Sequence, residues 1–319
     1  MIIFYFAILI ISFFVLSFSS QKLVNSISNL CKFLGWKEFV VAFFFIAFSV
    51  SLPNFSVGIF SAMNKVPELS LGDVVGGNIF DLSLCLGLAA IFSKNGILAS
   101  SKTIQGSAIY LVFLILLFFV FLSDGYFSRL DGLFLLILFF FYVFWLFQKD
   151  DRFKKIYGET EEKKRISFFL NNFFLFLLYS ALMIVSSYGV VASAKFLAEF
   201  FKLSIGLIGL FIVAIGNSLP ETFFSLQAVR ANQNWLVLGN LIGGVIVTMT
   251  LVLGTVSLIS PIEVQNSQHF FLARFFLLIV SIFFLLFLRS HERISKKEGF
   301  FLLLSYIFYL LFAIFQVSR

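Results

Sequence analysis

The chain has 319 residues, of which 61% are apolar and only 12% are charged, and its formal net charge is +7. Soluble domains carry about 25% charged residues, so this composition excludes a soluble globular protein and indicates a helical membrane protein. The basic excess lies in short segments between apolar runs, so we expect the lipid bilayer as a partner and no nucleic-acid binding. The 50 phenylalanines are interpreted as lipid-facing filler rather than as an aromatic binding site.

Ten apolar runs have about the length, some 20 residues, that crosses a hydrocarbon core of about 30 Å. The first run has no basic segment before it and no small-residue cleavage site after it, so we expect it to be a retained span rather than a signal peptide. The predicted spans are 2–19, 38–62, 69–93, 104–123, 128–147, 167–188, 201–228, 235–260, 269–289 and 298–316.

Two stretches, 47–87 and 214–254, match each other at one constant offset, with position 47 aligned to 214 and position 87 to 254. Thirteen of their 41 positions are identical without a gap, including a Ser-Leu-Pro triplet and a Gly-Gly pair, which indicates an internal repeat. Five predicted spans separate equivalent positions, and because five is odd, the second half must enter the membrane upside down. The predicted fold class is an all-α polytopic membrane protein with two inverted five-helix halves, 1–148 and 167–319, joined by a loop at 149–166.

The distribution of lysine and arginine predicts the orientation of these spans. Seventeen of the 23 basic residues fall on the side of the 149–165 loop, and six fall on the opposite side. Basic loops stay in the cytoplasm, so both termini are expected outside. A compact chain without a large cytoplasmic insert indicates an integral protein of a prokaryotic plasma membrane, and the loop itself is interpreted as a solvated hinge.

Two acidic residues, Asp81 and Glu221, lie well inside apolar runs, and Asp73 lies one turn into another. An ionised carboxylate in the bilayer costs roughly 3 kcal/mol or more and needs a partner. No Lys or Arg lies at a comparable depth to neutralise Asp81 or Glu221, so the missing partner is predicted to be a cation or a proton. The alternative is a pair of permanently protonated acids hydrogen-bonded to neighbouring helices.

Pro53 and Pro220 occupy equivalent positions in the two copies, where each should break its helix and free the carbonyl four residues earlier. Oxygen ligands in such numbers suit Ca²⁺, whereas Mg²⁺ gives up its waters reluctantly. The alternative for each proline is a simple kink without a role in binding. The predicted cluster of hard oxygen ligands combines the carbonyls of Ser49 and Gly216 with the side chains of Ser51, Asn54, Ser218 and Glu221.

The glycine pairs at 76–77 and 243–244 are expected to allow close helix packing. The two cysteines, Cys31 in a predicted loop and Cys85 inside a span, give no disulfide framework and no metal-binding spacing. The chain contains no H-E-x-x-H or G-x-S-x-G motif and no glycine-rich phosphate loop. We therefore expect a membrane transporter without a cofactor rather than an enzyme.

The segments SLPN…GDVVGGNIFD and GNSLPET…GNLIGGVIV resemble the two repeat motifs of the calcium/cation antiporter superfamily, which includes the sodium/calcium exchangers. The resemblance covers the two repeat stretches directly and extends over the chain through the ten-span inverted layout. It implies a central ion site in which acids of the two repeats bind Ca²⁺ while Na⁺ or H⁺ moves the opposite way by alternating access.

This sequence departs from the family pattern G-T/N-S-L-P-E…G-N-x-I-G-S-N-x-x-N/D at several places. Asn54 replaces the usual first glutamate, Val50 replaces a threonine, and Gly77 and Gly244 replace serines, while Asp81 adds an acid. In the second copy, Val245 and Thr248 stand at the Asn/Asp positions. The ligand set that the resemblance implies is Ser51, Asn54, Asn78, Asp81, Asn217, Ser218, Glu221 and Thr248.

The leading hypothesis is a secondary active antiporter that exchanges Ca²⁺ for Na⁺ or H⁺. Two central carboxylates balance one divalent ion, so two monovalent ions per Ca²⁺ are expected and the cycle should be electroneutral. A second hypothesis is the same fold with another cation, such as K⁺, Na⁺/H⁺ or Mn²⁺. A third is a membrane protein that keeps the fold but no longer transports.

Overall fold

The computed structural model describes residues 1–33, 49–99, 102–148, 166–230, 234–264, 268–290 and 292–317, and it is almost entirely helical. Three short π-helical segments and four two-residue strands interrupt or join the helices. The α-helices are α1 (Ile2–Phe33), α3 (Ser49–Met63), α4 (Pro67–Phe80), α5 (Leu86–Phe92), α6 (Lys102–Phe121), α7 (Arg129–Gln148), α8 (Ile166–Phe201), α9 (Ile205–Ile208), α10 (Ala214–Arg230), α11 (Asn234–Val247), α12 (Leu253–Ile259), α13 (Gln268–Ser290) and α14 (Lys296–Val317). The π-helical segments are η2 (Asp81–Cys85), η4 (Gly209–Val213) and η5 (Thr248–Val252), and the strands are β1 (Ile97–Leu98), β2 (Tyr126–Phe127), β3 (Ile262–Glu263) and β4 (Arg293–Ile294).

Eight helical stretches of the described residues are long and apolar enough to cross a membrane. α14 occupies the predicted tenth span, and α3 occupies the described part of the predicted second span. Two predicted boundaries were wrong by more than ten residues, because α1 continues to Phe33 and α8 continues to Phe201. Cys31 therefore lies in a helix and not in the predicted loop, whereas the predicted 149–166 loop lies outside the described residues except for Ile166.

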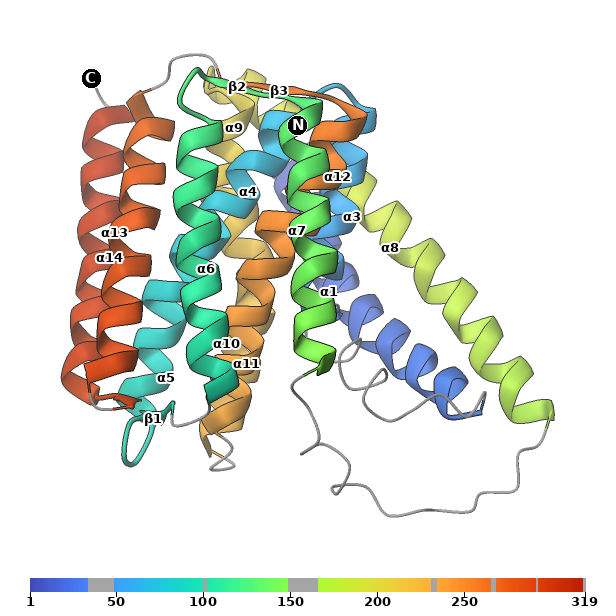
Figure 1. Ribbon diagram of the computed structural model, residues 1–319. Helices are drawn as coiled ribbons and strands as arrows, with labels where there is room; N and C mark the ends of the chain where they lie inside the picture. The colour runs from blue at the N-terminus through green and yellow to red at the C-terminus, as the bar shows by residue number, and fades with distance from the viewer. Residues whose placement is uncertain are drawn as a thin grey trace.

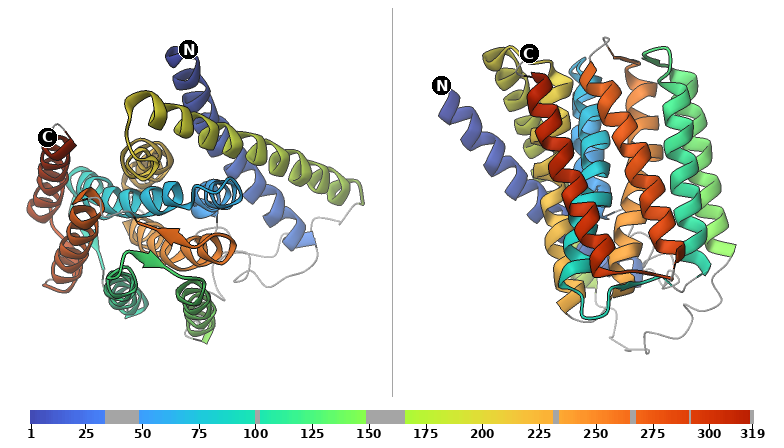
Figure 2. Two further views of the ribbon diagram at one scale, coloured as in Figure 1. Left: turned by 90° about the horizontal axis from the view of Figure 1, so that it is seen from above. Right: turned by 90° about the vertical axis from the view of Figure 1, so that its left-hand side faces the viewer.

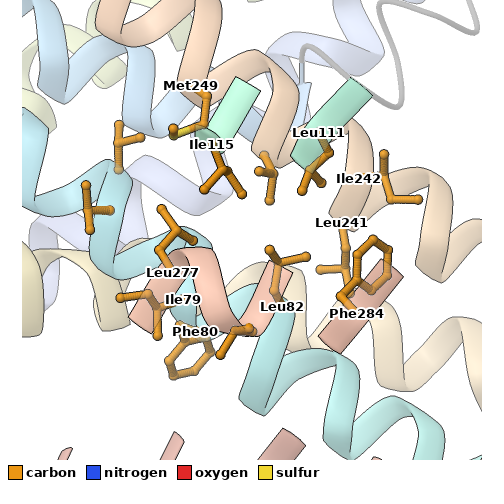
Figure 3. Close-up of a cluster of buried hydrophobic side chains, with 14 of the residues drawn as sticks. Ile79, Phe80, Leu82, Leu111, Ile115, Leu241, Ile242, Met249, Leu277 and Phe284 are labelled. Carbon is orange, nitrogen blue, oxygen red and sulfur yellow. The ribbon is translucent and has the colours of Figure 1, made fainter. Parts of the chain in front are cut away.

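The second helix of each repeat motif occupies the centre of the bundle. In an 18-residue window within Pro67–Phe92 and another within Leu236–Ile259, 83% of the residues are buried, compared with 22% in Ile2–Ser19. Figure 1 shows these central helices enclosed by α6, α7, α13 and α14 on one side and by α1 and α8 on the other. The apolar side chains of Figure 3 come from both halves and meet in one cluster, with labelled members Ile79, Phe80, Leu82, Leu111, Ile115, Leu241, Ile242, Met249, Leu277 and Phe284.

α1 and α8, the first helix of each half, pack along each other as a long tilted pair beside the bundle (Figure 1). Tyr5 and Phe196 stack with their ring centroids 3.9 Å apart. Near the other end of the pair, the Asn29 Nδ2 donates to the Asn172 Oδ1 at 2.9 Å. These contacts explain why the two helices continue beyond the apolar runs that hydropathy identifies.

The inverted repeat is visible at the two ends of the bundle. β1 pairs with β4 at one end, through Ile97 opposite Ile294, and β2 pairs with β3 at the other end, through Phe127 opposite Ile262. Each pair joins the two halves, and β4 is the repeat equivalent of β2, since Phe127 aligns with Ile294. The start of α1 and the end of α14 lie at the same end of the bundle (Figure 2), as an even number of spans requires.

Glycines bring the two halves into backbone contact at symmetric positions. A Cβ at Gly87 on α5 would lie 2.7 Å from the carbonyl oxygen of Gly299 on α14, and a Cβ at Gly254 on α12 would lie 2.9 Å from that of Gly132 on α7. Gly87 and Gly254 are equivalent in the repeat, as are Gly132 and Gly299. The last helix of each half therefore packs against the central helix of the other half.

A capping box begins α7 and recurs at the start of α14. The backbone N–H of Ser128 donates to the Asp131 carboxylate at 2.8 Å, and the N–H of Asp131 donates to the Ser128 Oγ at 3.2 Å. Ser295 and Glu298 make the same two bonds at 2.7 and 3.3 Å. The box satisfies N–H groups that a helix start leaves unpaired, and it stands at equivalent positions of the two halves.

Ser128→Ala and Ser295→Ala are each expected to lower the free energy of unfolding by about 1 kcal/mol, because the first turn loses a hydrogen-bond acceptor. Thermal unfolding of the detergent-solubilised protein measures the effect. Ser305→Ala is the control, since the Ser305 hydroxyl donates to the Leu302 carbonyl of its own helix and caps no helix start among the described residues. Equal shifts for all three variants would contradict a capping role.

Candidate cation site

All eight residues of the predicted ligand set are buried in the centre of the bundle. They come from five elements: α3 with Ser51 and Asn54, α4 with Asn78, η2 with Asp81, α10 with Asn217, Ser218 and Glu221, and η5 with Thr248. Side chains that lie far apart in the sequence thus come together, as Thr248 does with Asn78 and as Ser218 and Glu221 do with Asp81.

The helices are not broken where the prolines predicted a break. Pro53 lies inside α3 and Pro220 lies inside α10, and both helices continue through the proline. The predicted break was wrong because a proline removes one N–H, whereas the turns on either side keep their own bonds and are held by packing.

π-helical segments distort the two central helices instead. η2 begins at Asp81 and η5 begins at Thr248, which are equivalent residues of the two copies. A π-helical turn inside an α-helix is rare and is frequently found at a functional site. The irregular backbone therefore lies on α4–η2–α5 and α11–η5–α12, next to the predicted ligands.

Hydrogen bonds join the site residues of the two halves. The Asn217 Nδ2 donates to the Asp73 Oδ2 at 2.9 Å, and the Thr248 hydroxyl donates to the Asn78 Oδ1 at 2.9 Å. The Ser218 hydroxyl lies close enough to stabilise the Asp81 carboxylate. Each contact links a first-half residue to a second-half residue, so any relative movement of the halves changes the site.

Asp81 and Glu221 lie close enough to interact electrostatically, and each has an oxygen without a hydrogen-bond partner in the described part of the chain. Asp73, Asp81 and Glu221 are the acidic residues among the buried polar side chains described, and those side chains include no Lys, Arg or His. Two buried carboxyl groups therefore lie near each other, and the buried side chains described supply no basic partner for either.

Carboxylates alone do not enclose an ion here. Within the described segments, no three His, Cys, Asp or Glu side chains lie close enough to hold a metal ion by themselves. A cation bound between Asp81 and Glu221 would also need neutral oxygens, and the unpartnered Asn54 Oδ1 lies among the buried polar atoms of the described segments. Such a mixed set of hard oxygens suits Ca²⁺ or Na⁺ rather than a transition metal.

Asp73 is a third buried acid that the predicted ligand set omits. It has 0% exposed surface, and its second oxygen, Oδ1, has no partner among the described residues. It lies only one turn into the predicted span 69–93, whereas Asp81 lies well inside it. The signal that could have identified it is its repeat counterpart, Asn240, which is also polar and also buried.

The glycine pairs have different surroundings. A Cβ at Gly76 would lie 2.0 Å from the Leu210 carbonyl oxygen, so the predicted close packing holds there. A Cβ at Gly77 would come no closer than 3.3 Å to the Ser218 Oγ, and at Gly244 it would meet no described atom within 4 Å. Gly77 thus lies beside a candidate ligand, and packing against a described helix does not explain Gly244.

Gly76→Ala is expected to destabilise the protein by about 3 kcal/mol or more, because the new methyl group collides with backbone that cannot give way. Gly77→Ala is the matched control, since its methyl group would meet only the Ser218 Oγ at 3.3 Å, a side-chain atom that needs to shift by a few tenths of an ångström. The yield of monodisperse protein and its melting temperature in detergent measure both variants. Equal stability of the two variants would show that α4 does not pack this tightly against η4.

Known proteins with the same architecture match almost the whole chain. The family model "Sodium/calcium exchanger protein" matches residues 4–148 and 171–315. Inner membrane protein YrbG of Escherichia coli is 27% identical over 310 residues, covering 92% of this chain and 91% of that protein. Sodium/calcium exchanger MaX1 of Methanosarcina acetivorans is 25% identical over 343 residues, covering 96% of this chain and 97% of that protein.

A solved structure of the sodium-calcium exchanger NCX_Mj, soaked with Na⁺ and Sr²⁺, superposes with a TM-score of 0.65 at 27% identity. The match covers 98% of this chain and 99% of that chain. The family model covers both halves of the repeat, and the solved structure shares the inverted helical bundle. The chain is an integral membrane protein that belongs to the sodium/calcium exchanger family.

Proposed function

We propose that this protein is a secondary active cation antiporter that exchanges Ca²⁺ for Na⁺ or H⁺ at the central site. The observation that carries the proposal is the facing pair Asp81 and Glu221, which is buried and has no basic partner among the described residues. Names of matched proteins support the same class of substrate, since MaX1 and NCX_Mj are both called sodium/calcium exchangers.

The inverted halves supply the means of alternating access. Site residues of one half bond to those of the other, through Asn217 with Asp73 and through Thr248 with Asn78. Rocking of one half against the other would expose the same midplane site first to one side and then to the other. Exchange is obligatory because two unneutralised carboxylates are too costly in the membrane core. After Ca²⁺ leaves on one side, counter-ions must bind before the halves can rock back.

The proposed ligands are those predicted from the sequence, with unequal roles. Asp81 and Glu221 supply the charge, and Ser51, Asn54, Asn78, Asn217, Ser218 and Thr248 supply neutral oxygens or hold the acids in place. The proposed orientation also follows the sequence, with the β1–β4 end, where Lys94, Arg293, Lys296 and Lys297 lie, in the cytoplasm. Both termini would then face the outside.

Ion flux in proteoliposomes tests the proposal. Vesicles loaded with Na⁺, or held at an acidic internal pH, should take up ⁴⁵Ca²⁺ as Na⁺ or protons leave down their gradient. An ionophore that collapses that gradient should stop the uptake. If only the central pair exchanges ions, uptake leaves the membrane potential unchanged. Uptake that generates a potential would show that a further charge, such as that of Asp73, takes part. If no uptake occurred under either gradient, Ca²⁺ antiport would be excluded as the function.

A different transported cation is the second candidate, and the composition of the site favours it specifically. Asn54 and Thr248 are neutral where the family pattern allows acids, and Gly77 and Gly244 contribute no hydroxyl. Fewer charged and hydroxyl ligands favour a weaker or a monovalent ion. Competition of K⁺, Na⁺ and Mn²⁺ against ⁴⁵Ca²⁺ uptake separates the candidates, because the true substrate competes at the lowest concentration.

A further inference from the structure

The three buried acids lie on one of two helix interfaces that the repeat relates to each other. We call the contact of α4, η2 and α5 with α10 the polar seam, and the contact of α11, η5 and α12 with α3 the counterpart interface. Asp73 and Asp81 enter the polar seam from α4 and η2, and Glu221 enters it from α10. Their equivalents on the counterpart interface are Asn240, Thr248 and Asn54, all neutral.

Polar residues continue along the seam on both sides of the central pair. Toward the β2–β3 end, Asp73 accepts a hydrogen bond from Asn217. Toward the β1–β4 end, the thiol of Cys85 lies close to the hydroxyls of Thr222 and Ser225. Asp73 precedes Asp81 by eight residues and Cys85 follows it by four, so at 1.5 Å per residue the seam extends over about 18 Å.

The counterpart interface lacks this continuity. The equivalents of Thr222, Ser225 and Cys85 are Phe55, Gly58 and Val252. Val252 is completely buried, and a Cβ at Gly58 would lie 3.1 Å from its Cγ1. Among the described residues, Asn54 and Asn240 retain unpartnered amide atoms there, and the unpartnered Ser70 Oγ lies beside Gly58, but none of these groups carries a charge.

Buried polar atoms without partners occur at each level of the seam. In the described part of the chain they are the Asp73 Oδ1, the Asp81 Oδ1, the Glu221 Oε2 and the Ser225 Oγ. Leaving such a group unbonded in a buried place is unfavourable, and more so where the group is charged. A row of these atoms along one interface therefore needs polar occupants, which are water and cations.

We propose that cations cross the membrane core along the polar seam and not along the counterpart interface. Asp73 is then a third cation-binding carboxylate on the β2–β3 side of the central pair, and Thr222, Ser225 and Cys85 line the way toward the β1–β4 end. This inference rests on the proposed cation transport for its direction of movement. The hydration of the seam, however, can be measured without any transport.

The test uses thiol labelling, because Cys85 lies on the seam and its equivalent Val252 lies on the counterpart interface. Cys31→Ser leaves Cys85 as the single thiol of the chain. The matched protein carries Val252→Cys in a Cys31→Ser, Cys85→Ser background. Both are reconstituted and exposed to 2-(trimethylammonium)ethyl methanethiosulfonate, a cationic reagent that reacts from water, and mass spectrometry measures the labelled fraction over time.

Cys85 is expected to label at least tenfold faster than the cysteine at position 252, and Ca²⁺ is expected to slow the labelling of Cys85. Equal rates, or no labelling of Cys85, would overturn the seam whether or not the vesicles show flux. Selective labelling of Cys85 in vesicles without ⁴⁵Ca²⁺ flux would support a hydrated seam and would contradict the proposed Ca²⁺ antiport. The two proposals can therefore fail separately.

Discussion

Glu221→Gln is expected to abolish Ca²⁺ exchange while leaving the protein folded. The substitution keeps the shape of the side chain and removes one of the two charges at the central site. A unit charge about 4 Å from its partner contributes about 4 kcal/mol at an effective dielectric constant near 20. That loss lowers the affinity about a thousandfold, so ⁴⁵Ca²⁺ uptake into proteoliposomes should fall to the background of empty vesicles.

Glu199→Gln is the control for this variant, because Glu199 is an exposed acid on α8, away from the site. Its uptake should equal that of the unmodified protein. Both variants should elute as monodisperse protein. Glu221→Gln should melt at or above the wild-type temperature, since removal of an uncompensated buried charge does not weaken the fold, and Glu199→Gln should melt at the wild-type temperature because it changes an exposed side chain. Retained uptake by a folded Glu221→Gln protein would exclude Glu221 from ion binding.

Much of the architecture could be predicted from the sequence because the repeat is marked by residues with strict backbone requirements. Gly87 and Gly254 recur at the same offset since each faces the backbone of the opposite half at close distance. A side chain at either position would push the two halves apart, so both positions require glycine. The inverted topology then followed from counting apolar runs.

The helix boundaries and the local irregularities could not be predicted from hydropathy. α1 and α8 continue past their apolar runs because each extension packs on the apolar run of the other helix, as Asn29 of α1 does on Asn172 and Phe196 of α8 does on Tyr5. The residues of η2 and η5 have no composition that distinguishes them from an ordinary α-helix. Their π-helical form depends on packing between the halves, which a single segment of sequence does not contain.

The burial of Asp73 could not be predicted from its own span alone. Asp73 lies only one turn into its predicted span, but its burial is determined by α9, η4 and α10, which pack on α4 from the second half. Comparison of the two copies is more informative than depth. Each acid of the seam has a neutral polar equivalent in the other copy, namely Asn240, Thr248 and Asn54.

Asp81→Asn is expected to convert the protein from divalent to monovalent exchange. Glu221 alone can balance one Na⁺ or H⁺ but not Ca²⁺, and the amide oxygen of the new side chain can still accept a bond from the Ser218 hydroxyl. By the same estimate as for Glu221, Ca²⁺ affinity should fall about a thousandfold. Exchange of ²²Na⁺ for unlabelled Na⁺ should remain measurable in the same vesicles, which would separate a lost charge from a collapsed site.

Thr248→Ser is the matched control, because Thr248 is the repeat equivalent of Asp81 and serine keeps the hydroxyl that donates to Asn78. We expect its Ca²⁺ uptake to stay within about threefold of the unmodified protein, since no charge is lost and one methyl group has little effect on a polar contact. If Thr248→Ser and Asp81→Asn lowered Ca²⁺ uptake equally, the two copies would contribute alike to the site. The charge on η2 would then have no special role, and the assignment of the central charge pair to Asp81 and Glu221 would be wrong.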